Sequence, residues 1–93
     1  MSLKDTLTQK LEKQVESWET KLDSLRAQFN EYKAKAENHE ATEELKEKTA
    51  KRIADLQEDI DAARAKLKEV RASGESHLSE VKGKVEDFLN RRS

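Results

Sequence analysis

The sequence predicts an all-α protein, in which a long antiparallel helical hairpin of the coiled-coil type is followed by a short third amphipathic helix. Three observations predict this fold. The chain of 93 residues has no proline and only 2 glycines. Charged residues make up 42% of it and apolar residues 33%, whereas globular chains average about 25% and 45–50%. Its apolar residues recur every ~3.5 residues, the period of a coiled-coil seam.

The first helix is expected over about residues 3–37. This stretch is rich in Ala, Leu, Glu, Lys, Gln and Arg, the strongest helix formers. Its apolar residues follow one another in steps of four and three, so they share one face of a helix. The predicted packing seam consists of Leu11, Val15, Trp18, Leu22, Leu25, Phe29 and Tyr32. Leu3 and Leu7 extend this seam by steps of four.

A turn is expected over about residues 38–42. If the first seam continued without a break, it would bury the polar residues His39, Glu43 and Lys46. Burying an unpaired charge costs several kcal/mol, so the pattern must be reset here. A stammer in one long helix is an alternative, but a reversal gives two helices of matched length, about 52 and 48 Å. Asn38 is a candidate for the left-handed residue that ends the first helix.

The second helix is expected over about residues 42–73, with Thr42 as its N-cap. Its seam consists of Ile53, Leu56, Ile60, Ala63, Leu67 and Val70. In an antiparallel pair, the numbers of facing residues have a constant sum. We prefer a sum of 78, which places Trp18 beside Ile60 and centres the turn on His39. A sum of 85 is the competing register.

A break at residues 74–75 separates the second helix from a third, expected over about residues 76–90. Gly74 is typical of a left-handed residue that ends a helix, and Ser76 of an N-cap. The residues of the third helix expected to dock are Leu78, Val81, Val85 and Phe88. Since a helix of ~15 residues is marginal alone in water, this stripe must dock on the hairpin or on another chain.

No pattern in the sequence indicates catalysis, a cofactor or a metal. The chain has no cysteine, and its 2 histidines, His39 and His77, lack a partner at the spacing of a helical metal site. Serine and threonine are present without a glycine elbow, and there is no glycine-rich phosphate loop. Trp18, Phe29 and Tyr32 share one stripe that is better explained as core than as a ligand site. We therefore expect no cofactor, no metal and no enzymatic activity.

The charge pattern restricts the partners. With 19 Lys and Arg against 20 Asp and Glu, the net charge is −1, whereas nucleic-acid binders concentrate cations on one face. We therefore expect no nucleic acid as partner. No apolar run approaches the ~20 residues that span a bilayer, and residues 1–5 lack the apolar core of a secretory signal. We expect a cytoplasmic protein, and consider a membrane partner a weaker alternative.

Residues 14–27 read Gln-Val-Glu-Ser-Trp-Glu-Thr-Lys-Leu-Asp-Ser-Leu-Arg-Ala, and residues 65–74 and 81–88 cover the second helix end and the third helix. These stretches resemble a family of small bacterial coiled-coil proteins, commonly labelled stress-response proteins. The family typically shows Gln-x-x-x-Trp-x-x-Lys-Ile-Asp-x-Leu in its first helix. Where its third helix often carries tryptophans, His77, Leu78 and Phe88 stand here. The resemblance implies a non-enzymatic role linked to stress, and no site residues.

We therefore expect a non-enzymatic structural or interaction protein that acts through helix–helix association. A two-helix hairpin buries one stripe per helix, and Ala54, Ala62 and Ala65 widen the apolar face of the second helix. The expected partner is a second copy, with a dimer favoured in an oligomeric bundle, or another helical protein. Two alternatives are reversible amphipathic binding to lipid or hydrophobic surfaces and a chain that is largely disordered in water.

Overall fold

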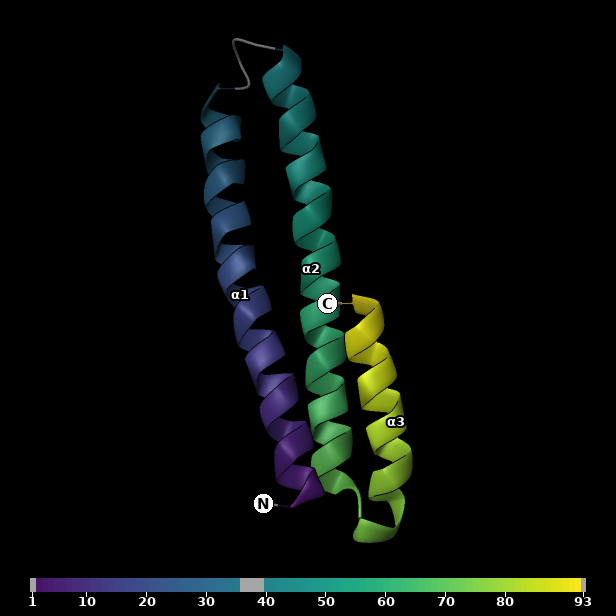
Figure 1. Cartoon of the computed structure of the whole chain (residues 1–93). Helices are drawn as coiled ribbons and strands as arrows, with labels where there is room; N and C mark the ends of the chain where they lie inside the picture. The colour runs from purple at the N-terminus through teal and green to yellow at the C-terminus, as the bar shows by residue number, and fades with distance from the viewer. Residues whose placement is uncertain (1, 36–39, 93) are drawn as a thin grey trace.

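The computed structural model describes residues 2–35 and 40–92, and these residues form three α-helices and no β-strand (Figure 1). The helices are α1 (Leu3–Lys35), α2 (Glu40–Ala72) and α3 (Glu75–Arg92). α1 packs mostly against α2, and α3 contacts both. The prediction of an all-α fold is therefore confirmed.

α1 and α2 form a helical hairpin. Each has 33 residues, which is about 50 Å at about 1.5 Å per residue, and the two lie side by side in opposite directions (Figure 1). α3 turns back along α2 and covers only part of its length. The molecule is a rod of 59 × 18 × 17 Å. We call residues 3–22, 59–72 and α3 the three-helix half, and residues 23–35 and 40–58 the two-helix half.

The apolar core fills the three-helix half. One face of each helix supplies it, at the three- and four-residue steps of an amphipathic helix. The buried apolar residues are Leu7, Leu11, Val15, Trp18 and Leu22 of α1, Ile60, Ala63, Leu67 and Val70 of α2, and Leu78, Val81 and Val85 of α3. In the two-helix half, the seam residues Leu25, Phe29, Tyr32, Ile53 and Leu56 are only half-buried. Two helices shield the middle of a seam, and a third is needed to shield its edge.

The boundary between α1 and α2 differs from the expected one. α2 begins at Glu40, so the predicted turn is wrong for residues 40–42, and Thr42 lies within the helix instead of capping it. The physical reason is that an acidic residue is favoured in a first helical turn and alanine is the strongest helix former. Asn38 and His39, the expected cap and turn centre, lie outside the described residues.

The connection between α2 and α3 also differs from the expected one. Gly74 has no positive φ, so it is not a left-handed cap, and Ser76 lies in the first turn of α3. The Ser73 hydroxyl donates a hydrogen bond to the Glu69 carbonyl at 2.7 Å, which closes the end of α2. The Gly74 carbonyl accepts one from the His77 N–H at 3.0 Å, which opens α3. These bonds pair some of the carbonyl and N–H groups at the two helix ends without a left-handed glycine.

Polar pairs between α1 and α2 indicate the register on one flank of the hairpin. They join Arg26 to Gln57 at 3.4 Å, Arg71 to Glu12 at 3.1 Å, and Arg64 to Glu19. The residue numbers in each pair sum to 83. Side chains lean toward the N-terminus of their own helix. In two antiparallel helices, the side chains that meet therefore belong to residues whose numbers add up to more than the numbers of two residues with facing Cα atoms.

The facing sum is therefore a few residues below 83. The helix ends agree, since Leu3 with Ala72 and Lys35 with Glu40 each sum to 75. These values fit the preferred register of 78. In the competing register of 85, the pairs that join the two helices would lean away from each other.

The difference in burial between the two halves predicts different costs for the same substitution in α1. Leu11→Ala removes a side chain that is 0% exposed, and such a change costs about 2–5 kcal/mol. Leu25→Ala removes a half-buried side chain and should cost less than half as much. Urea denaturation followed by circular dichroism measures both. Equal costs would mean that the two halves are equally well packed.

Candidate helix-association surface

α3 docks on the hairpin of its own chain, which the sequence left open. Leu78, Val81 and Val85 are buried, and Phe88 is half-buried against the core. Two ion pairs fix the direction of α3 along α2. Lys84 Nζ lies 3.9 Å from a Glu69 carboxylate oxygen, and further along α3 Arg92 pairs with Asp59. The expected docking stripe therefore packs within the chain.

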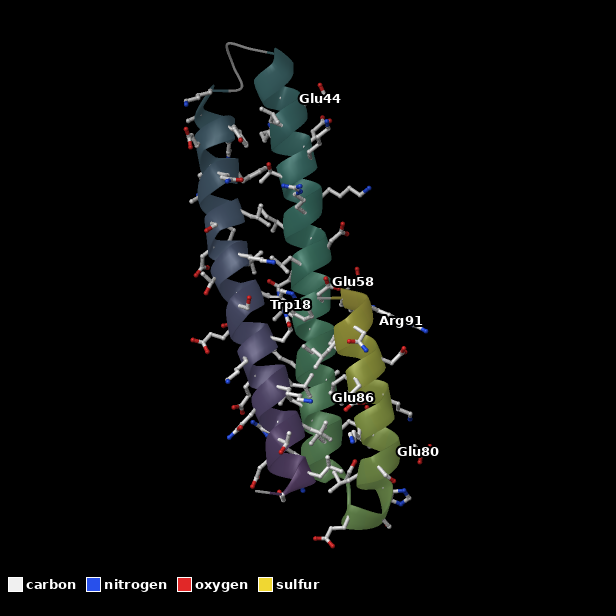
Figure 2. All side chains as sticks on the ribbon, viewed as in Figure 1. Trp18, Glu44, Glu58, Glu80, Glu86 and Arg91 are labelled. Atoms are coloured by element: carbon white, nitrogen blue, oxygen red, sulfur yellow. The ribbon has the colours of Figure 1, made fainter. Side chains whose placement is uncertain are left out.

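An aromatic contact holds the C-terminal end of α3. The rings of Trp18 and Phe88 meet edge to face, with centroids 6.1 Å apart and planes at 79°. The Arg92 guanidinium lies 5.3 Å from the centroid of Phe88 and also pairs with Asp59. Trp18 lies in the seam at the height where α3 ends (Figure 2). A residue predicted for the α1–α2 seam thus also anchors α3.

A groove opens on the hairpin where α3 ends. It has a volume of about 540 Å³ and is lined by Thr20, Lys21, Ser24 and Leu25 of α1 and by Arg52, Asp55, Leu56 and Asp59 of α2. A second hollow follows it and shares Arg52. That hollow is lined by Gln28, Tyr32, Leu45, Lys48, Thr49, Lys51 and Arg52. We call the two together the docking groove. Asp59 lines the first hollow and also pairs with Arg92 of α3, so the groove begins where the α3 contact ends.

The docking groove combines incompletely buried apolar residues with charges. Leu25, Leu56 and Tyr32 are half-buried, and Leu45 is 44% exposed. The sequence placed Leu25, Leu56 and Tyr32 in the seam, but it did not single out Leu45 or the buried Thr49. The spacing of α2 could have indicated both residues, because Thr49 lies one turn and Leu45 two turns before Ile53 on the same side of the helix.

Two kinds of site are absent from the described residues, a metal-holding cluster and a helix that crosses a bilayer. In residues 2–35 and 40–92, no group of three or more histidine, aspartate or glutamate side chains could hold a metal ion. None of the described helices is long and apolar enough to cross a bilayer. His77 is exposed in the first turn of α3, and His39 lies outside the described residues.

Comparison with known proteins does not identify a family. No protein-family model, curated protein or solved structure matches the chain. The resemblance to small bacterial coiled-coil proteins therefore stays a prediction from the sequence.

Removing the ring of Phe88 should loosen the end of α3. We expect Phe88→Ala to cost about 1–3 kcal/mol, below the ~3–5 kcal/mol of a fully buried phenylalanine. It should also shift the emission of Trp18 to longer wavelength, because the indole gains water contact. Phe29→Ala in the two-helix half is the matched control and should leave this emission unchanged. Unchanged emission in both variants would contradict the anchoring contact.

Proposed function

We propose that this protein acts through helix–helix association, as a non-enzymatic structural or interaction protein built on an antiparallel coiled coil. The observation that carries the proposal is the docking groove. α3 covers one face of the hairpin in the three-helix half, and the same face is open in the two-helix half. An amphipathic helix laid into such a groove buries its own apolar stripe and completes a bundle.

Apolar surface left in the docking groove provides the driving force. Full burial of a leucine stabilises by about 1.5–3 kcal/mol, and Leu25, Leu45 and Leu56 are each only partly buried. Covering them gains a few kcal/mol, from which the loss of translational and side-chain freedom must be subtracted. We therefore expect weak and reversible binding.

The partner in this proposal is a helical surface, either on a second copy of the chain or on another protein. A dimer within an oligomeric bundle is the form that the sequence favours. A cytoplasmic location and a role linked to stress belong to the same proposal. They are supported by the composition and by the family resemblance, respectively.

Self-association should depend on salt. The groove carries several cations, so two copies that meet through it repel each other until salt screens the charges. By sedimentation equilibrium, we expect the average mass to rise further above 10.7 kDa at about 500 mM salt than at about 20 mM. Circular dichroism should show strong helicity in both buffers. A single-chain mass in both would remove the dimer, and weak helicity would favour the disordered alternative.

Reversible binding to a lipid surface is the second candidate function. Leu45 is 44% exposed and lines the same hollow as Lys48 and Lys51, and apolar residues flanked by cations bind anionic bilayers. This function requires co-flotation with anionic vesicles that Leu45→Glu abolishes. Leu3→Glu is the matched control, because Leu3 is 36% exposed and lies at the other end of the hairpin. Failure to float with anionic or neutral vesicles excludes this candidate.

A further inference from the structure

The sign of the charge changes along one face of the hairpin. In the three-helix half, both ion pairs that join the described residues of α3 to the hairpin have the anion on the hairpin and the cation on α3: Lys84 lies near Glu69, and Arg92 pairs with Asp59. In the docking groove, which continues this face, the hairpin supplies mainly cations. The groove cations are Lys21, Lys48, Lys51 and Arg52. A helix suited to the groove therefore differs in charge from α3.

The groove cations are poorly neutralised within the chain. Among the described residues, Lys21, Lys51 and Arg52 form no ion pair. Lys48 pairs with Glu44 at 3.5 Å, but both side chains are about 70% exposed, and such pairs contribute little. Of the two groove anions, Asp59 already pairs with Arg92, which leaves Asp55 alone against the four groove cations. The groove is thus locally basic in a chain whose net charge is −1.

We propose that the docking groove binds an amphipathic helix of another protein, in which acidic residues flank the apolar stripe. This inference deepens the proposed function and rests on it. The apolar stripe packs on Leu25, Leu45 and Leu56, and the carboxylates reach Lys51 and Arg52. From Leu45 to Asp59 the groove follows α2 for about 21 Å, which is the length of about four helical turns.

A second copy of this chain fits the groove less well. Suppose that two copies pack through their two-helix halves with their α2 helices antiparallel. Lys48 and Arg52 of one α2 then face Arg52 and Lys48 of the other. Like charges that face each other across an interface oppose binding. An α3 from another copy meets the same obstacle, because it presents Lys84 and Arg92 to the hairpin. An acidic helix avoids both repulsions.

Two synthetic peptides test the proposal with the full chain. Both have about 18 residues and the apolar spacing of α3; one carries glutamate at every flanking position and the other carries lysine. Binding is measured by fluorescence anisotropy of the labelled peptide at about 20 mM salt and again at about 500 mM. We expect the acidic peptide to bind at least about tenfold more tightly than the basic one, and its affinity to fall as salt rises.

A pair of variants locates the contact. Arg52→Glu should weaken binding of the acidic peptide about tenfold or more, because it replaces an attraction with a repulsion. Lys13→Glu makes the same change of charge on an exposed residue of α1 that lines neither hollow, and should leave the affinity unchanged. Circular dichroism checks that both variants keep the helicity of the parent chain.

The outcomes separate this inference from the proposed function. Equal binding of the two peptides, or no effect of Arg52→Glu, overturns the acidic helix while helix association stands. Self-association without peptide binding shows that the occupant is a second copy, and again only the inference fails. If neither peptide binds and the chain stays single at both salt concentrations, the inference and the proposed function fail together.

Discussion

Burial of the α1–α2 seam beneath α3 is the interaction on which the rest of the structure depends. Leu11, Trp18 and Ile60 are almost fully removed from water only where three helices surround them. α3 has 18 residues, whereas α1 and α2 have 33 each, so it covers only part of the seam. In the two-helix half the same seam continues without a third helix to cover it.

The sequence predicted the elements that depend on local periodicity and missed the features that depend on distant contacts. Two long helices could be predicted from the three- and four-residue spacing of the apolar residues and from the polar residues that one uninterrupted seam would have buried. The conformation of Gly74 depends on how the ends of α2 and α3 are hydrogen-bonded, which the steps of apolar residues do not report. The anchoring of the C-terminal end of α3 depends on the contact between Trp18 and Phe88, which stand far apart in the chain.

The hairpin register shows how flank pairs have to be interpreted. Glu19 with Arg64 and Glu12 with Arg71 would suggest a register near 83 if paired side chains stood level with each other. Each side chain leans toward the N-terminus of its own helix. The Cα atoms of two paired residues therefore lie at different heights along the hairpin, several residues apart. The exposed pairs contribute little energy. The seam sets the register and the pairs accommodate to it.

The net charge of the chain is close to zero, but positive and negative side chains are unevenly distributed along one face of the hairpin. Asp59 marks the division: on one side α3 brings cations to the hairpin, and on the other Arg52 and Lys48 project from the hairpin itself. In the proposed complex this arrangement would discriminate as well as attract, because repulsion against a wrong helix contributes to specificity as well as attraction to the right one. α3 itself is kept in the covered half by its two-residue connection to α2 and by the contact of Phe88 with Trp18. The groove cations beyond it are the ones that the proposed acidic helix would neutralise.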